Sequence, residues 1–208
     1  MVRLAVWSLL AGVIAACAPQ VSSTAAEADE TGEIPDTAET MVVAGGCFWC
    51  VEADFEKQEG VYEVVSGYSG GTLQNATYKN HEGHREVAQI YYDPSVTDYA
   101  TLVDKFLRSV DVTDDGGQFC DRGFSYTTAI HYETDEQREI AESAVAEAEA
   151  VLGQDIVTPV LPRMFFVEAE DYHQDYYKKN PVRYRYYRAA CGRNARLKEL
   201  WGDAALVS

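Results

Sequence analysis

One short segment, Gly45-Gly46-Cys47-Phe48-Trp49-Cys50, constrains the fold more than any other part of this 208-residue chain. The apolar run from Met41 to Ala44 precedes it and predicts a β-strand, whereas the residues that follow, Val51 to Lys57, suit a helix. The double glycine is typical of a tight turn between two such elements. Cys47 is therefore expected at a helix N-terminus, where free backbone N–H groups and the helix dipole favour an anion such as a thiolate.

The residues beside Cys47 favour a reactive cysteine over a structural one. Phe48 and Trp49 are large aromatic side chains that could form the wall of an apolar pocket next to the sulfur, and an S-methyl group packs well on such a wall. Cys50 follows three residues after Cys47, which places a second thiol within one helical turn. A buried structural cysteine is the alternative, but it accounts for neither the paired glycines nor the second thiol.

A series of motifs in chain order resembles that of the A-type peptide methionine sulfoxide reductases, the MsrA family. The similarity extends from about residue 41 to about residue 196 and includes the segment around Cys47. The other motifs are Gly67-Tyr68-Ser69-Gly70-Gly71, Ala76-Thr77-Tyr78, Gly83-His84-Arg85-Glu86, Tyr92-Asp93-Pro94, Asp121 with Tyr126, and Glu170 to Tyr176. The resemblance implies an enzyme that reduces the S epimer of methionine sulfoxide, free or in proteins, and so repairs oxidative damage.

The resemblance also assigns roles to individual residues. It makes Cys47 the nucleophile and Glu86 the acid that protonates the departing oxygen, since a carboxylic acid buried among apolar groups has a raised pKa and stays protonated at neutral pH. The residues that it implies for substrate binding are Phe48, Trp49, Tyr78, Asp121 and Tyr126. Without the resemblance, Glu86 would be one of 34 acidic residues, and each tyrosine one of 14.

The first half-reaction leaves a sulfenic acid on Cys47, and a second thiol must then condense with it. Many family members carry that thiol four residues after an Asn-Pro pair, but Arg185 occupies this position here. Cys50 is the preferred resolving cysteine because it is nearest in sequence. Cys191, in a C-terminal tail that could swing inward, is close behind, and Cys120 is the third candidate. A thioredoxin-like protein is expected to reduce the resulting disulfide.

Two other classes of function stay open at this point. The Cys47-x-x-Cys50 spacing also suits a thiol–disulfide oxidoreductase, although such motifs usually carry the tryptophan before the first cysteine in a thioredoxin-like order of elements. A lipid-anchored redox or metal sensor is the non-enzymatic alternative. His81, His84 and Cys120 match no closed zinc-ligand spacing, so we expect neither a metal nor a cofactor.

Residues 1–17 are predicted to be a signal peptide. Arg3 supplies a positive charge, Leu4 to Ala16 is an apolar run of signal-peptide length, and Ile14-Ala15-Ala16-Cys17 matches the pattern of a bacterial lipoprotein box. Cys17 would then carry acyl chains that anchor the protein to a membrane, with the catalytic domain in the periplasm. An ordinary secretory signal that is cut near Ala18 is the alternative.

The composition separates a tether from one folded domain. Residues 18–40 are rich in small and acidic residues and are expected to form a flexible tether, whereas residues 41–208 suit one catalytic domain. The chain has 34 acidic and 17 basic side chains, and its formal net charge is −17. This excess of negative charge argues against binding to nucleic acid and against electrostatic binding to anionic lipid.

Hydrophobic spacing and turn signals predict the other elements of the domain. Thr134 is a suitable N-cap for a helix that ends before Gly153. We expect strands at residues 62–68, 86–92, 126–132 and 164–167, helices at 98–110 and 171–179, and a loop at 116–124. Asn180-Pro181 is expected to end the helix at 171–179. Strands in adjacent pairs predict an α+β fold. The resemblance implies the ferredoxin-like MsrA fold, a two-layer sandwich of a mixed β-sheet with flanking helices.

Overall fold

The structure, a computed structural model, describes Met1 and residues 34–207 of the chain. The predicted signal peptide with Cys17, and the tether up to residue 33, lie outside the described residues. The first strand starts at Glu39, two residues before the expected start of the domain. The last residues of the expected tether therefore belong to the sheet.

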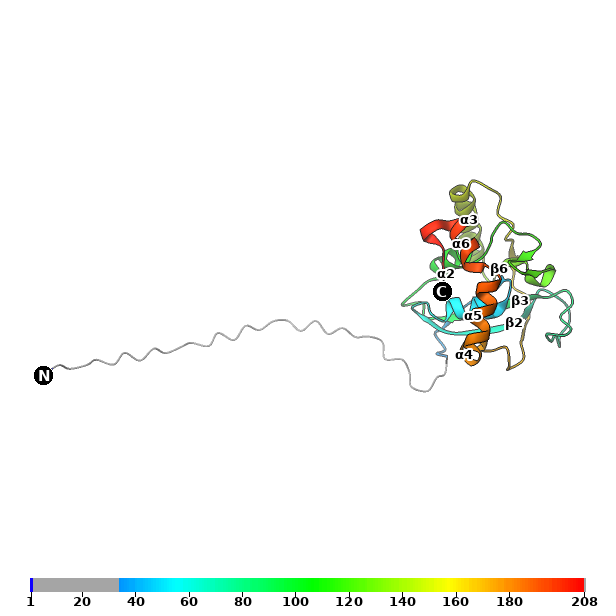
Figure 1. The fold of residues 1–208 in the computed structure, drawn as a ribbon, viewed down its shortest axis with the longest axis horizontal. Helices are drawn as coiled ribbons and strands as arrows, with labels where there is room; N and C mark the ends of the chain where they lie inside the picture. The colour runs from blue at the N-terminus through cyan, green and yellow to red at the C-terminus, as the bar shows by residue number, and fades with distance from the viewer. Residues whose placement is uncertain (2–33, 208) are drawn as a thin grey trace. The chain divides into compact units, whose positions relative to one another are not determined.

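A six-stranded mixed sheet forms the centre of the folded unit (Figure 1). Its strands are β1 (Glu39–Gly45), β2 (Val61–Ser69), β3 (Arg85–Tyr92), β6 (Thr128–Tyr132), β7 (Val160–Pro162) and β8 (Phe166–Glu168). They are ordered β7-β6-β1-β3-β2-β8, and all neighbours are antiparallel except β6 and β7, which are parallel. β1 and β3 are neighbours at the centre of the sheet. β1 ends just before Cys47 and β3 carries Glu86, so the sheet brings these two residues to the same region.

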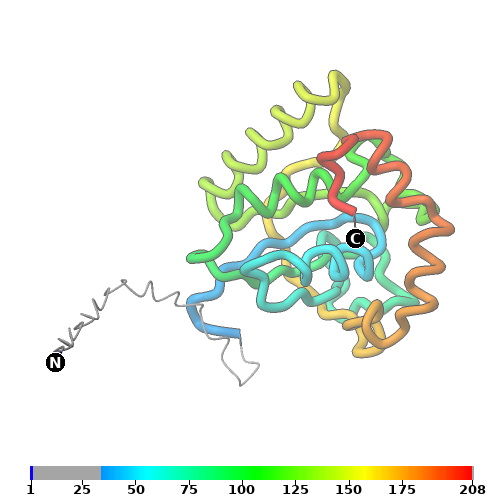
Figure 2. Tube along the Cα trace, turned by 60° about the vertical axis from the view of Figure 1, so that its left-hand side comes forward, coloured from blue at the N-terminus to red at the C-terminus, as the bar shows by residue number. Residues whose placement is uncertain are grey.

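Within residues 34–207, six α-helices flank the sheet. They are α1 (Phe48–Phe55), α2 (Tyr99–Leu107), α3 (Asp135–Leu152), α4 (Tyr176–Lys179), α5 (Pro181–Ala190) and α6 (Arg193–Trp201). Helices α2 and α3 pack together, and α5 continues into α6 along another side of the unit (Figure 2). Helix α1 contacts β2 and β3 as well as α4. It therefore lies between the sheet and the C-terminal part of the chain.

The side chains of β1 point alternately into two hydrophobic clusters, as the geometry of a strand requires. Met41 and Val43 belong to the main core, which packs the sheet against α1, α2, α3 and α6. Val42 and Ala44 belong to a smaller cluster formed with β3, β6 and residues near β7 and β8. In α1, only Trp49 among the eight residues is not fully buried. The helix that begins after Cys47 is thus part of the core.

The predicted ends of α3 are confirmed. The hydroxyl of Thr134 accepts a hydrogen bond from the backbone N–H of Gln137 at 3.1 Å. Gly153 ends the helix with a φ of 65°, a left-handed conformation in which glycine avoids the steric cost of a Cβ atom. Local sequence signals were sufficient at both ends of this helix.

The C-terminal region differs most from the prediction. The helix expected at residues 171–179 is reduced to α4, because residues 171–175 form turns. Pro181, expected to end the helical region, instead begins α5, since a proline fits the first turn of a helix, where its missing N–H is not needed. Helix α6 follows directly. The tail expected around Cys191 is therefore a pair of helices, with Cys191 at their junction.

Smaller differences concern the ends of elements. The strand expected at residues 126–132 starts at Thr128, because Phe124–Tyr126 forms a short 3₁₀ helix. The expected loop at 116–124 contains a small hairpin of β4 (Gly117–Gln118) and β5 (Asp121–Arg122). The strand expected at 164–167 is β8, and the helix expected at 98–110 is α2 with shorter ends. The three-residue strand β7 was not predicted.

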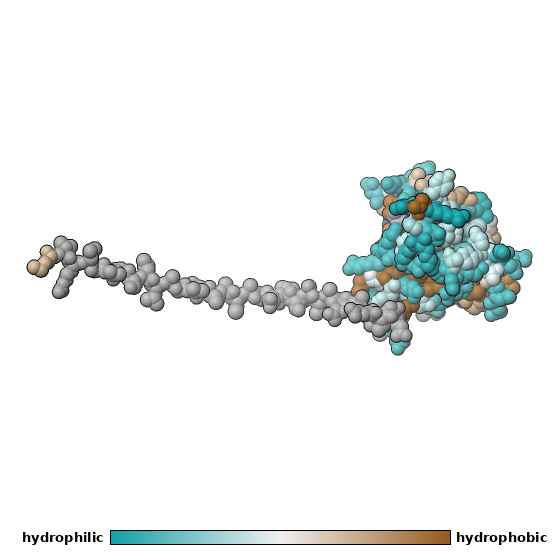
Figure 3. Space-filling view, turned by 60° about the horizontal axis from the view of Figure 1, so that its bottom comes forward, coloured by the Kyte–Doolittle hydropathy of each residue, from teal (hydrophilic) through white to brown (hydrophobic). Residues whose placement is uncertain are grey.

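The surface of the folded unit is consistent with the acidic composition. Figure 3 shows a face that is mostly hydrophilic, with smaller hydrophobic areas between the polar ones. Helix α3 is an example, since only Ala141 and Ala148 of its 18 residues are fully buried. No helix within the described part of the chain is both long enough and apolar enough to cross a bilayer.

Candidate active site

The turn before Cys47 requires the two glycines. Gly46 has a φ of +78°, and a Cβ atom there would lie 2.5 Å from Cβ of Gln118 in the β4–β5 hairpin. A Cβ atom on Gly45 would lie 2.6 Å from a methyl carbon of Val51. Only glycine lets the backbone approach the hairpin and α1 this closely. The turn places Cys47 immediately before the first residue of α1, as predicted from the sequence.

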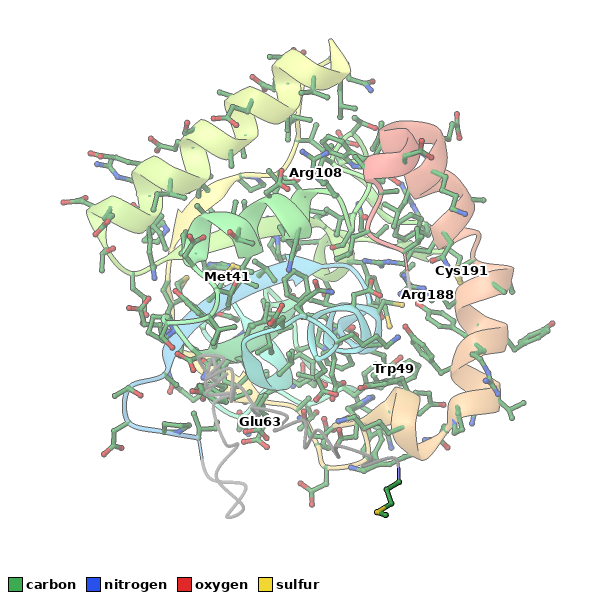
Figure 4. The ribbon with its side chains drawn as sticks, turned by 90° about the vertical axis from the view of Figure 1, so that its left-hand side faces the viewer. Met41, Trp49, Glu63, Arg108, Arg188 and Cys191 are labelled. Atoms are coloured by element: carbon green, nitrogen blue, oxygen red, sulfur yellow. A yellow bond between two sulfur atoms is a disulfide. The ribbon has the colours of Figure 1, made fainter. Side chains whose placement is uncertain are left out.

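Aromatic rings form a wall beside Cys47. Trp49 stacks on Tyr176 of α4 with ring centroids 3.7 Å apart, and its indole N–H donates a hydrogen bond to Nδ1 of His173 at 3.1 Å. Phe48 is fully buried, with its ring centroid 5.0 Å from that of His173. Figure 4 shows Trp49 next to α4. The two aromatic residues after Cys47 are thus held by a segment more than 120 positions away in the sequence.

Glu86 projects from β3 toward the start of α1. Its carboxyl group accepts a hydrogen bond from the backbone N–H of Phe48 at 3.1 Å, and only 2% of the residue is exposed. Burial raises the pKa of Glu86 to about 8, so the carboxyl group keeps its proton at pH 7. A general acid must carry a proton that it can donate at the working pH, and this protonated carboxyl group beside a cysteine does so.

Two tyrosines lie next to this carboxyl group. Tyr126, at the end of the short 3₁₀ helix, is within hydrogen-bonding reach of both Glu86 and Tyr78. Burial raises the pKa of both tyrosine hydroxyls above their usual range, so both remain hydrogen-bond donors at neutral pH. Tyr78 is 41% exposed and faces solvent in part. The structure therefore brings together the three groups that the sequence predicted around the substrate oxygen.

The thiols of Cys47 and Cys50 lie together in one buried cluster, and neither is in a disulfide. The hydrogen bond from Cys47, together with the charges of Arg193 and Arg188, lowers the pKa of Cys50 to about 7. Burial raises the pKa of Cys47 well above its usual range. We had expected the helix start to favour ionisation of Cys47. Instead, ionisation of the pair is favoured at Cys50, because the hydrogen bond from Cys47 and the two cations stabilise negative charge there.

A buried ion pair lies behind Cys50 and was not predicted. Arg188 of α5 pairs with Asp54 of α1, with Nη1 3.1 Å from Oδ2, and both side chains are at least 94% buried. Arg193 at the start of α6 approaches the same carboxylate at 4.0 Å. Figure 4 shows Arg188 on the inner side of α5. The sequence spacing of these residues carries no signal, because only the packing of α5 and α6 against α1 brings them together.

Asp121 is joined to the site by a hydrogen bond from Tyr187, a residue that the sequence did not single out. Its carboxylate, on β5, accepts a hydrogen bond from the hydroxyl of Tyr187 on α5. That hydroxyl is also within hydrogen-bonding reach of the Cys47 thiol. Burial raises the pKa of Asp121, whereas the hydrogen bond from Tyr187 lowers it. Because Tyr184, Tyr186 and Tyr187 lie together in the sequence, nothing local distinguishes Tyr187 from its neighbours.

Cys120 and Cys191 form a disulfide, with Cα atoms 5.1 Å apart. Cys120 is in the β4–β5 hairpin, and Cys191 is the C-cap of α5, at its junction with α6 (Figure 4). In this state neither sulfur is a free thiol, in contrast to Cys47 and Cys50. Arg185, in the position of the usual family cysteine, is exposed on α5. Cys50 is therefore the free thiol that lies beside Cys47.

One group of carboxylates in the described residues has the spacing that a metal ion requires. It consists of Glu52, Glu56 and Asp175. The ammonium group of Lys178 lies 2.6 Å from the carboxylate of Glu56 and 2.8 Å from that of Asp175. These contacts join α4 to α1 by ion pairs. The ammonium group thus supplies the positive charge that a metal ion would otherwise bring to these carboxylates.

Comparison with known proteins identifies the family. A model of a family described as peptide methionine sulfoxide reductase matches residues 39–205. The chain belongs to this family. A curated relative, peptide methionine sulfoxide reductase MsrA 2 of Rhizobium meliloti (strain 1021), is 53% identical over 166 residues, which cover 79% of this chain and 84% of the relative. The family resemblance noted in the sequence is confirmed.

Two solved structures share the fold. The reduced form of Mxr1 from Saccharomyces cerevisiae has a TM-score of 0.65 and 28% identity, and the match covers 71% of this chain and 88% of Mxr1. Methionine sulfoxide reductase A of Corynebacterium diphtheriae has a TM-score of 0.64 and 30% identity, covering 71% of this chain and 77% of that protein. The predicted α+β fold is confirmed. As a family member, the chain is an oxidoreductase that reduces methionine sulfoxide by cysteine redox chemistry.

Proposed function

We propose that Cys47 is the nucleophile and Glu86 the proton donor in the reduction of methionine sulfoxide. The sulfur of Cys47 attacks the sulfoxide sulfur while the substrate oxygen is protonated. The oxygen ends on Cys47, and methionine leaves. The sulfoxide is reduced and the cysteine is oxidised to a sulfenic acid, so this half-reaction needs no further electron donor.

The hydrogen bond from the backbone N–H of Phe48 to the buried carboxyl group of Glu86 carries this proposal. Phe48 directly follows Cys47, so the bond ties the carboxyl group to the start of α1. A pKa of about 8 leaves that group protonated at neutral pH, ready to supply the proton that the oxygen needs. Tyr78 and Tyr126 supply further hydrogen bonds to the same oxygen.

The aromatic wall suits the methyl end of the substrate. Phe48 and Trp49 offer apolar ring faces to an S-methyl group, while the oxygen turns toward the carboxyl and hydroxyl groups. The substrate in this scheme is methionine sulfoxide, free or in proteins, and the family resemblance favours the S epimer. Turnover of resolved epimers tests this choice, and equal rates for the two epimers would contradict it.

For recycling, Cys50 is the first candidate. A Cys47–Cys50 disulfide would form with loss of water when the Cys50 thiol attacks the sulfenic acid. Cys191 stays the second candidate, although its sulfur must first be released from Cys120. A thioredoxin-like protein then reduces the disulfide by thiol exchange. Mxr1 of S. cerevisiae, which has the same fold, forms a complex with Trx2, and this supports a reductant of that class.

The N-terminal sequence supports a lipid anchor. The lipoprotein-box pattern that ends at Cys17 implies an exported protein held at a bacterial membrane, with its catalytic domain in the periplasm. Intact-mass analysis of the mature protein should show acyl chains on an N-terminal Cys17. An unmodified chain that begins at Ala18 would indicate a soluble exported enzyme instead.

The central test is turnover of a methionine sulfoxide peptide with dithiothreitol, measured as the loss of one oxygen by mass spectrometry. Cys47→Ser should abolish this turnover while the fold survives, and substantial residual turnover would contradict the assignment. Cys50→Ser should retain one turnover but lose recycling by thioredoxin. If Cys50→Ser recycles normally and Cys191→Ser does not, the order of the two resolving candidates is reversed.

A further inference from the structure

Tyr187 occupies a position that the proposed mechanism does not use. It lies on α5, and its ring meets Trp49 edge to face with centroids 6.0 Å apart. Its hydroxyl donates a hydrogen bond to Asp121, and the residue packs against the buried cluster that contains Cys47 and Cys50. Tyr187 therefore joins an acidic side chain to the cluster that holds the reacting sulfur.

The attack requires Cys47 as a thiolate, and the surroundings of this sulfur mostly oppose ionisation. The groups that face it are Cys50 on the same helix, Glu86 from β3, Tyr78 from the loop after β2, and Tyr187 from α5. Burial and the proximity of Cys50 and Glu86 raise the pKa of Cys47, whereas the hydrogen bond with Tyr187 lowers it. Tyr187 is thus the contact that favours the reactive form.

We propose that Tyr187 is a further catalytic residue whose hydroxyl donates a hydrogen bond to Cys47 when that sulfur becomes a thiolate. The inference rests on the proposed role of Cys47 as the nucleophile. In the resting enzyme the hydroxyl donates to Asp121, which holds it next to the thiol. When negative charge develops on Cys47, the sulfur becomes a much stronger acceptor than the neutral thiol, and the same hydroxyl turns to it.

The Cys120–Cys191 disulfide holds both partners of this hydrogen bond. Cys120 directly precedes Asp121 in the hairpin. The backbone N–H of Cys191 donates to the carbonyl oxygen of Tyr187 at 3.0 Å, so the two residues are one helical turn apart. The covalent bond thus joins the segment that carries Asp121 to the helix end that carries Tyr187. In this arrangement the disulfide positions Tyr187.

The test is the pH dependence of alkylation of Cys47 by iodoacetamide in the full-length chain, followed by mass spectrometry of the Cys47 peptide. The chain carries Cys50→Ser, so that Cys50 cannot react or share the proton. Loss of a hydrogen bond to a charged group should raise the pKa of Cys47 by about 1–2 units in Tyr187→Phe, which slows alkylation about 10–100-fold at pH 7. An unchanged profile in Tyr187→Phe would overturn the proposal.

The matched control is Tyr186→Phe. Tyr186 is the preceding residue and is 77% exposed, so removal of its hydroxyl should leave the alkylation profile unchanged. No sulfoxide is present in this assay. The alkylation assay therefore tests Tyr187 independently of whether Cys47 is the nucleophile. That second question is answered by the turnover of Cys47→Ser.

The positioning role of the disulfide needs a second variant. Cys120→Ser combined with Cys191→Ser removes the bond without leaving an unpaired thiol. We expect it to shift the alkylation profile in the same direction as Tyr187→Phe, and to add no further shift in the Tyr187→Phe background. An unchanged profile, or an equal shift in both backgrounds, would show that the disulfide does not act through Tyr187.

Discussion

Two regions of the chain meet at Cys47, and their electrostatic properties are opposite. On the sheet side, Glu86 is buried, has no cationic partner among residues 34–207, and keeps its proton up to a pH of about 8. On the helix side, Cys50 faces Arg188 and Arg193, and its pKa is lowered to about 7. Between about pH 7 and pH 8, one region thus favours the protonated form of its group and the other the ionised form.

The difference shows how one site can prepare an acid and a thiolate together. Each group responds to its own surroundings. Burial raises the pKa of the carboxyl group, while the hydrogen bond from Cys47 and the nearby guanidinium groups lower that of the Cys50 thiol. The two regions also act on each other. Negative charge on Cys50 adds to burial in raising the pKa of Glu86. Ionisation on the helix side therefore helps Glu86 on the sheet side to keep its proton.

The largest expected effect comes from a substitution that removes the proton donor on the sheet side. Glu86→Gln should slow the first turnover by about 10²–10⁴-fold, the usual contribution of general acid catalysis. Substrate binding should change much less, because the amide has nearly the same shape. Rapid-quench measurement of methionine formation at pH 7 gives the rate.

Glu52→Gln is the matched control for this variant. Glu52 is also a buried carboxyl group, with its pKa raised by burial to about 7, but its hydrogen bonds go to Ser66 and to the backbone of Asp175. Its replacement should leave the first turnover close to the wild-type rate. Equal losses in Glu52→Gln and Glu86→Gln would point to a general effect of buried acids on the fold.

The second prediction concerns a substitution that removes one charge of the buried ion pair on the helix side. Asp54→Ala leaves Arg188 buried without its ion-pair partner, which should lower the free energy of unfolding by about 3–5 kcal/mol. Urea denaturation measures this loss. Asp104→Ala removes an ion pair whose side chains are 56% and 29% exposed, and should cost about 1 kcal/mol or less. Similar losses of unfolding free energy in the two variants would contradict the larger contribution to stability that we assign to the buried pair.

The third prediction concerns pH. The acid form of Glu86 is present below its pKa of about 8 and is lost above it, whereas the thiolate of Cys47 increases with pH. The wild-type first-turnover rate should therefore rise by about tenfold per pH unit and level off near pH 8. In Glu86→Gln the rise should continue beyond pH 8. Profiles that bend at the same pH in both enzymes would place the titrating acid elsewhere.

The smallest expected effect is at the exposed edge of the sheet side. Tyr78→Phe should slow the first turnover by about tenfold or less, equivalent to about 0.5–1.5 kcal/mol, because Tyr78 is 41% exposed and water can replace its hydroxyl. Tyr126→Phe should slow it more, since Tyr126 also lies within reach of Glu86. A larger loss in Tyr78→Phe than in Tyr126→Phe would reverse this order.

The sequence predicted the sheet side of the site better than the helix side. Local signals were sufficient where a feature depends on neighbouring residues. Such features are the turn at Gly45 and Gly46, the helix start at Cys47 and the ends of α3. Glu86 was selected by its place in a family motif. Its protonated state follows from burial that only the folded chain provides.

The helix side depends on contacts between distant parts of the chain. Arg188 meets Asp54 across 134 positions, and Tyr187 meets Asp121 across 66. Helices α5 and α6 bury few apolar residues, so their hydrophobic spacing gives a weak signal. Pro181 was interpreted as the end of a helix although it begins one. Without these helices, neither the cations behind Cys50 nor the disulfide of Cys191 could be foreseen.

The Cys120–Cys191 bond also has a consequence for the unfolded chain. It closes a loop of 71 residues that contains β5, β6, α3, β7, β8, α4 and α5. Closing a loop of this length removes conformational entropy from the unfolded ensemble and, in the chain-entropy treatment, favours the native state by about 4 kcal/mol. In an oxidising compartment, where the bond persists, this covalent loop accounts for a substantial share of the 5–15 kcal/mol or so by which folded domains are usually stable.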